Sequence, residues 1–272
     1  MKKTSEWLNI SHFNRALNNN VFKMTATILL IGLAAFASID KPTSQAPSKN
    51  ETVVLLHGLC RTSRSMAKMG KALTADGYNV INVNYPSRSA TIDELTTEVF
   101  QGLEVGSTDR PSILKNSKKV HFVTHSMGGI LLQNYLEKQA ATPWLGNVVM
   151  LAPPSRGSEV TDKLGGIKLY QWINGPAGNQ LGTGAGSCPL RLKAPTFELG
   201  IIAGDRSINP ILSMLIPGPD DGKVSLARVK PAAYTDYIKL HVTHACMAGN
   251  KHVIEQTKYF LKHGKFNPTE KN

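Results

Sequence analysis

The feature that most constrains the fold is the alternation of short apolar runs with amphipathic stretches from residue 52 onward. The apolar runs are rich in Val, Ile and Leu, as strands buried on both faces are. They cover residues 52–56, 79–85, 120–124, 148–151, 197–203 and 237–242. Helical patterns cover residues 65–75, 92–103, 129–139 and 253–263. This alternation predicts an α/β fold with helices on both faces of a mostly parallel central sheet.

Residues 153–195 interrupt this rhythm with many glycines and with Tyr170 and Trp172 among them. A long irregular segment inside a compact domain is usually functional or disordered. Its Gly-Thr-Gly-Ala-Gly run at 182–186 does not fit a phosphate loop, because no Lys-Ser/Thr pair follows and Pro189 interrupts the place of the helix. Residues 153–195 are therefore expected to be a functional or a disordered segment.

The first 37 residues have the layout of an export signal. Basic residues precede an uncharged stretch at 24–39, and the small-x-small sequence Ala35-Phe36-Ala37 follows the apolar core. Sixteen helical residues reach about 24 Å, short of a bilayer core of about 30 Å. We expect a leader at 1–37 and a periplasmic or secreted protein, the alternative being an N-terminal membrane anchor. Residues 38–50 are expected to be a linker, 51–264 the α/β domain and 265–272 a tail.

Charge and cysteine content restrict the partners. The chain has 31 Lys and Arg against 19 Asp and Glu, a net charge of +12. These charges are dispersed, with no basic helix and no cluster interleaved with aromatic residues, so nucleic-acid binding is not expected. The charge favours solubility and weak association with an anionic membrane surface. Three widely spaced cysteines exclude a disulfide framework but leave one bridge open.

Ser126 is the candidate nucleophile. It lies in the sequence Thr124-His125-Ser126-Met127-Gly128, between a predicted strand and a predicted helix. A serine at such a turn projects its hydroxyl beyond the sheet, while the helix start offers free amides and a positive dipole. Gly128 supplies the small neighbour that the turn needs, whereas Thr124 stands where a glycine is usual. The alternative is an ordinary strand–helix junction in which Ser126 caps the helix.

The sequence His57-Gly58-Leu59 ends the first predicted strand of the domain. Acyl transfer needs two amides, from two segments, that point at the developing oxyanion. We expect them from Leu59, freed by the bend at Gly58, and from Met127. His57 and Gly58 are expected to lie at the substrate-binding site; the alternative is that they simply end the strand.

A base and an acid come late in the chain. His244 follows the last predicted strand and is the expected base, whereas His241 lies within the strand pattern. Asp221, before Gly222 in a turn, is the expected acid. The chain order Ser, Asp, His is the order that a fold of this type imposes on a catalytic triad. Asp205 and Asp220 are the competing acids. A zinc site formed by His241, His244 and His252 is the alternative use of the histidines.

These motifs resemble the bacterial lipase and esterase branch of the α/β-hydrolases. The resemblance covers residues 52–260 and includes, in order, His57-Gly58, the stretch 125–129, Ala-Pro-Pro-Ser-Arg-Gly-Ser at 152–158, Asp-Gly-x-Val at 221–224 and His244. It implies an α/β-hydrolase fold, the triad Ser126, Asp221 and His244, and an oxyanion hole at Leu59 and Met127. It also implies that the insertion at 153–195 is a short cap over the acyl pocket.

From these observations we expect a serine hydrolase of carboxylic esters, acting on a small-molecule or lipid ester without cofactor or metal. Trp172 and Ile173 of the cap are expected to line the acyl pocket. The stretch at 154–157 differs from the Pro-His-x-Gly of many true lipases, so an esterase is a better description than a triacylglycerol lipase. Two alternatives remain: an acyltransferase with the same triad, and a non-catalytic binding protein on this fold.

Overall fold

The computed structural model describes residues 51–106 and 112–270, so the predicted leader and linker lie outside the described residues. The strands form one sheet in the order β2-β1-β3-β4-β5-β6, in which every neighbouring pair is parallel. They are β1 (Glu51–Leu56), β2 (Asn79–Val83), β3 (Lys119–His125), β4 (Leu145–Leu151), β5 (Leu199–Gly204) and β6 (Asp236–Leu240). All six predicted strands are present, and the expected α/β fold is confirmed.

The strand order reverses beside β1, because the chain goes outward to β2 and then returns across β1 to β3. Open parallel sheets bind ligands at such a reversal, beyond the carboxyl ends of the strands. His57 follows β1 and Ser126 follows β3, so both lie at this point. The topology thus brings together two motifs that are 69 residues apart in the chain (126 − 57).

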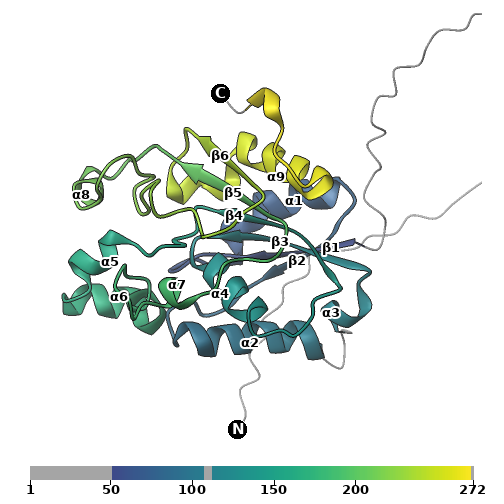
Figure 1. Ribbon diagram of the computed structural model, residues 1–272, viewed down its shortest axis with the longest axis horizontal. Helices are drawn as coiled ribbons and strands as arrows, with labels where there is room; N and C mark the ends of the chain where they lie inside the picture. The colour runs from purple at the N-terminus through teal and green to yellow at the C-terminus, as the bar shows by residue number, and fades with distance from the viewer. Residues whose placement is uncertain (1–50, 107–111, 271–272) are drawn as a thin grey trace, which may run out of the picture.

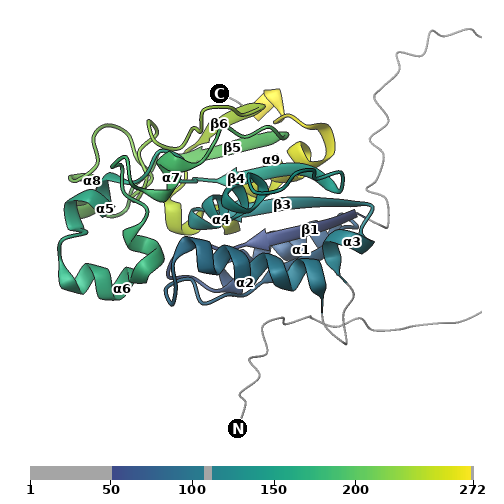
Figure 2. The same cartoon turned by 60° about the horizontal axis from the view of Figure 1, so that its bottom comes forward.

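Helices cover both faces of the sheet, as Figures 1 and 2 show. On one face α1 (Ala67–Ala75) contacts α9 (Lys251–His263), and on the other α2 (Ile92–Val105) contacts α4 (Met127–Leu136). Shorter helical turns are η1 (Ser63–Met66), α3 (Ile113–Asn116), α8 (Pro210–Ser213), η2 (His244–Gly249) and η3 (Pro268–Glu270). The predicted helix at 129–139 starts two residues earlier, directly after Ser126.

The packed core continues past residue 264, where a tail was expected. Phe266 is buried, and its ring centroid lies 4.9 Å from that of Phe260 in α9. The amide of Asn267 donates to the side-chain oxygen of Gln256 at 2.9 Å. The expected boundary was therefore too early, because Phe266 completes the core beneath α9.

The insertion at 153–195 forms a helical cap of α5 (Glu159–Leu164), α6 (Lys168–Asn179) and α7 (Cys188–Arg191). Helix α6 bends at Gly175, which has φ +66° and precedes Pro176. A Cβ at Gly175 would lie 2.0 Å from the carbonyl oxygen of Arg88, so the cap backbone touches the loop between β2 and α2. Only glycine fits this contact.

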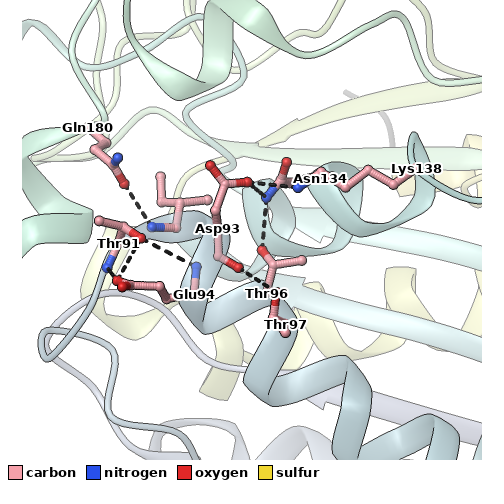
Figure 3. Close-up of polar contacts among 9 residues, drawn as sticks. Thr91, Asp93, Glu94, Thr96, Thr97, Asn134, Lys138 and Gln180 are labelled. Carbon is pink, nitrogen blue, oxygen red and sulfur yellow. Dashed lines mark hydrogen bonds and ion pairs between the residues drawn. The ribbon is translucent and has the colours of Figure 1, made fainter.

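The cap is also tied to the start of α2, as Figure 3 shows. The side-chain oxygen of Gln180 accepts the amide hydrogen of Ile92 at 2.7 Å. Thr91 and Glu94 form a reciprocal capping box at the same helix end. In the same first turn of α2, Asp93 accepts hydrogen bonds from Asn134 of α4 and from Lys138. The cap, α2 and α4 are therefore joined by one polar network.

The three cysteines are free thiols: Cys60 and Cys246 are exposed and Cys188 is buried. The bridge that the sequence left open is not formed. In residues 51–106 and 112–270, no helix combines the length and the apolar character needed to cross a bilayer.

Candidate active site

Ser126 occupies a strained turn between β3 and α4. Its φ of 53° and ψ of −124° lie outside the regions that side chains ordinarily allow. Its amide donates to the carbonyl oxygen of Leu151 in β4 at 2.8 Å, which fixes the turn to the sheet. The hydroxyl makes no capping hydrogen bond to α4, and the residue lines a pocket of about 260 Å³. The side chain is thus held by its backbone and not by a capping role.

The crowding around this turn explains its small residues. A Cβ at Gly128 would lie 2.7 Å from the carbonyl oxygen of Leu56 and 2.8 Å from that of His57. The unusual Thr124 is fully buried, and a Cβ at Gly129 would lie 3.1 Å from its Oγ1. Gly129 therefore provides the space that Thr124 occupies.

The two predicted oxyanion donors flank Ser126. Met127 is the first residue of α4, so its amide has no partner within the helix. Leu59 lines the same pocket as Ser126, and its amide makes no hydrogen bond to any residue in the described part of the chain. The turn that carries Leu59 is closed by a hydrogen bond from the amide of Arg61 to the carbonyl of Gly58 at 3.3 Å.

His57 does not line the substrate site, which corrects the expectation from sequence. Its ring is fully buried and stacks on Tyr85 with centroids 4.0 Å apart. Nδ1 donates to the carbonyl of Gly58, and Nε2 accepts from the amide of Tyr85. Burial lowers the pKa of His57, which keeps the ring neutral for this pattern. His57 thus supports the turn that carries Leu59. Gly58 packs against the nucleophile turn, since a Cβ at Gly58 would lie 3.1 Å from the Cβ of Ser126.

His244 and Asp221 form a buried pair. Nδ1 of His244 lies 2.7 Å from Oδ2 of Asp221, and the His244 amide donates to the Asp221 carbonyl at 2.9 Å. The other carboxylate oxygen accepts the amides of Lys223 and Val224 at 3.0 and 2.9 Å. His244 begins η2, four residues beyond the last residue of β6. The strand was expected to run further because buried Val242 continues the apolar pattern.

The competing acids have other partners. Asp205 lies 2.9 Å from both Lys239 and His241, and the His241 side chain is 75% exposed. Asp220 accepts hydrogen bonds from the amide of Gly222 and the hydroxyl of Ser213. Across the two described segments, no group of three or more His, Cys, Asp or Glu is arranged to hold a metal ion.

His125 links the nucleophile turn to the base. Its Nε2 donates to the carbonyl oxygen of His244 at 3.1 Å, and the two rings lie 4.7 Å apart. Burial, and then the charge of His244, lowers the pKa of His125 well below its ordinary value. No hydrogen bond joins the Ser126 hydroxyl to His244 among the described residues; such bonds are often long in free enzymes and shorten when substrate binds. Sequence analysis treated His125 only as a motif position.

Two pockets meet at this site, and they share Leu212 and Lys223. The Ser126 pocket, of about 260 Å³, has mostly apolar walls from the cap, including Val160, Leu164 and Ile173. The His244 pocket, of about 350 Å³, is lined by Arg61, Asp221 and His244 among others. Trp172 lines neither and is 75% exposed, so its expected place in the acyl pocket is wrong.

Trp172 and Ile173 are neighbours on α6, and a helix turns by about 100° per residue, so only one of them faces the site. Arg61 and Lys223 were missed by sequence analysis. Their positions gave a signal, because Arg61 lies two residues after Leu59 and Lys223 lies inside the Asp-Gly-x-Val stretch.

Comparisons with known proteins agree with this fold. The profile described as "Alpha/beta hydrolase family" matches residues 53–238. No curated protein matches by sequence. Among solved structures, the mature lipase BlEst2 of Bacillus licheniformis is 19% identical with a TM-score of 0.55, covering 81% of this chain and 94% of that one.

Two further structures share the fold at low identity. Phospholipase PlaB of Legionella pneumophila is 15% identical with a TM-score of 0.59, over 75% of this chain and 57% of that one. The lipase of Staphylococcus hyicus is 13% identical with a TM-score of 0.52, over 82% and 96%. At these identities the structures show the fold alone. With the family profile matching most of its length, the chain belongs to the α/β-hydrolase family.

Proposed function

We propose that the protein is a serine hydrolase that cleaves carboxylic esters through an acyl-enzyme on Ser126. The observation that carries the proposal is the buried Asp221–His244 pair, 2.7 Å apart, next to a serine held in a strained turn after β3. Ester cleavage by a serine needs a base held in one tautomer and a nucleophile free of other bonds. Both requirements are supported here.

In the first half-reaction Nε2 of His244 takes the proton of the Ser126 hydroxyl as Oγ attacks the ester carbonyl carbon. The Asp221 carboxylate holds Nδ1–H and stabilises the imidazolium. The carbonyl oxygen gains the negative charge and accepts hydrogen bonds from the amides of Leu59 and Met127. The C–O bond to the alcohol then breaks, and the alcohol leaves with the proton from His244.

In the second half-reaction a water gives its proton to His244 and attacks the acyl carbon. The bond to Ser126 Oγ breaks, the carboxylic acid leaves, and the proton returns to the serine. An alcohol in place of water would complete an acyl transfer with the same residues.

The two pockets suggest how the ester lies. The Ser126 pocket has apolar walls, so it suits an acyl chain, whose burial is favourable by about 0.8 kcal/mol per methylene. The leaving alcohol must receive its proton from His244, so it belongs on the side of the His244 pocket. This orientation is part of the proposal.

The test is labelling by a neutral organophosphonate together with turnover of a butyrate ester. We expect one phosphonate per chain, on Ser126, and loss of turnover by several orders of magnitude in Ser126→Ala. Ser158→Ala is the matched control: it lines the same pocket, but its hydroxyl donates to the Lys223 carbonyl at 3.0 Å. Adding glycerol and analysing the products separates hydrolysis from acyl transfer. A wild-type protein that is neither labelled nor active would contradict the proposal and favour a binding protein.

A further inference from the structure

Two cationic side chains lie at the His244 pocket, and one of them, Lys223, also lines the Ser126 pocket. Arg61 and Lys223 both line the His244 pocket. Arg61 also borders a groove of about 480 Å³ with Arg88. Asp221 is the one acid among the residues that line these two spaces and the Ser126 pocket, within the part of the chain that is described. Its carboxylate oxygens are already used by His244 and two amides.

Neither cation forms an ion pair with an acidic side chain of the described residues. The side chains of Arg61 and Lys223 make no hydrogen bond or ion pair with any residue in 51–106 or 112–270. Arg61 is exposed, whereas Lys223 is only partly exposed. Burial is the largest cause that lowers the pKa of Lys223; repulsion from Arg61 adds to it, and the Asp221 carboxylate acts in the opposite direction. A partly buried cation without a partner costs free energy, which a bound anion would recover.

The backbone explains why Lys223 is held there. Its amide donates to Asp221, and its carbonyl accepts from the hydroxyl of Ser158, so the residue is fixed between the acid and the cap. Arg61 lies two residues after Leu59 and lines the same His244 pocket. The two charges therefore come from the two loops that also supply the acid and an oxyanion amide.

Resting on the proposed function, we propose that the preferred ester carries an anionic group, a phosphate or carboxylate, on its alcohol portion, and that Arg61 and Lys223 bind it in the His244 pocket. The anion stays on the alcohol that leaves, so the half-reactions are unchanged: one acyl–oxygen bond breaks and the product is an anionic alcohol. Arginine and lysine form charge-assisted hydrogen bonds with such oxygens. The acyl group stays in the Ser126 pocket, whose walls are mostly apolar and which Arg61 does not line.

The experiment compares two nearly isosteric soluble esters, the butyrates of 3-hydroxybenzoate and of 3-hydroxybenzamide. For wild type we expect a higher kcat/KM for the anionic ester. In Arg61→Gln and Lys223→Gln we expect the ratio of anionic to neutral kcat/KM to fall by about tenfold, the usual effect of losing one charged hydrogen bond. Arg64→Gln, an exposed arginine three residues on that lines none of these pockets, should keep the wild-type ratio.

A second arm separates the sources of the anion. Phosphatidylglycerol and diacylglycerol with the same acyl chains are presented in micelles of a neutral detergent. If the ratio of anionic to neutral rates is larger for the lipid pair than for the benzoate pair, the anion that binds is a lipid headgroup. If the ratio is larger for the benzoate pair, the substrate is a soluble anionic ester. Either result supports the proposal. Equal wild-type rates on the members of both pairs, or an unchanged ratio in both glutamine variants, would overturn it.

Labelling by the neutral organophosphonate keeps the two proposals distinct. If Ser126 is labelled and the neutral ester is cleaved without any preference for the anion, only the anion site is wrong. If Ser126 is not labelled, the hydrolase mechanism itself fails. Lys223→Gln keeps both backbone hydrogen bonds to Asp221 and Ser158, so its labelling rate also reports whether the triad is intact.

Discussion

At the scale of single residues, the choice of acid follows from how each carboxylate is used. Both oxygens of Asp221 are engaged, one by His244 and the other by the amides of Lys223 and Val224. The carboxylate is therefore fixed in one orientation and holds the proton of His244 on Nδ1, leaving Nε2 to face a nucleophile. Asp205 instead binds Lys239 and His241. An asparagine at position 221 would no longer hold the proton of His244 on Nδ1.

We therefore expect Asp221→Asn to lower kcat on a butyrate ester by about 10⁴, as loss of the orienting acid does in serine hydrolases. Asp205→Asn, made as the matched control, should retain most of the activity, because its partners lie outside the site. Steady-state kinetics on folded variants checks both. A crippled Asp205→Asn with an active Asp221→Asn would assign the acid to the other position.

The sequence predicted residues that are fixed by backbone motifs better than residues that depend on side-chain direction. Ser126, Asp221 and His244 each follow from a turn, a glycine and the chain order. The structure brings the acid and the base together, whereas their roles await the kinetic test. His57 and Trp172 belong to correctly recognised segments but point away from the site. The direction of His57 is set by stacking on Tyr85, and that of Trp172 by the rotation of α6 about its axis. Neither can be derived from a motif.

At the scale of secondary-structure elements, the cap determines the space next to Ser126. Helices α5 and α6 supply Val160, Leu164 and Ile173 to the wall of the Ser126 pocket. Gly175 and Gln180 tie the cap to Arg88 and to the start of α2. The pocket of about 260 Å³ is therefore bounded by anchored elements, and under the proposed function its size would limit the length of the acyl chain.

Filling this pocket should shift the acyl preference. We expect Leu164→Trp to lower kcat/KM for long acyl esters while largely sparing acetate, by about fourfold for each methylene that can no longer be buried. A series of p-nitrophenyl esters of rising chain length measures the effect. Trp172→Ala is the comparison variant, since this exposed side chain lines neither pocket and its loss should leave the chain-length profile unchanged. The same shift in both variants would show that the cap acts through its overall position.

The elements themselves were predictable to different degrees. The six strands were recognised because strands covered on both sides are continuous apolar runs. Helices α1, α2 and α9 were recognised because one face of each is apolar, whereas α4 is buried along its whole length. The cap helices were not located, because glycines and prolines obscure their pattern and α6 contains a bend at Gly175. The cap helices are stabilised by tertiary contacts with Arg88 and α2, which cannot be predicted from the local sequence.

At the scale of the whole molecule, three buried imidazoles make stability depend on pH. His57 supports the turn that carries Leu59, His121 lies in β3 with its Nδ1 accepting the Asn147 amide, and His125 donates to the backbone carbonyl of His244. Burial is the main cause that lowers the pKa of each in the folded protein. The folded state thus favours all three in their neutral form.

The sign of the effect follows from where each state binds protons. In the unfolded chain these histidines titrate near pH 6.5. Below that pH the unfolded chain binds more protons than the folded protein does, so the free energy of unfolding falls as pH falls. Their contribution is fully present above about pH 6.5 and is lost progressively below it.

We therefore expect the free energy of unfolding, measured with urea, to decrease between pH 7.5 and pH 5.5 by about 1.4 kcal/mol for each buried imidazole that stays neutral. His121→Asn removes one such group far from Ser126 and should reduce the decrease by that amount, whereas His241→Gln replaces an exposed ring as a control. His125→Asn should act in the same direction and, in addition, lower the rate of phosphonate labelling, because it loses the hydrogen bond to the His244 carbonyl. An unfolding free energy that is constant over this range, or that rises as pH falls, would mean that these imidazoles accept protons in the folded protein despite their burial.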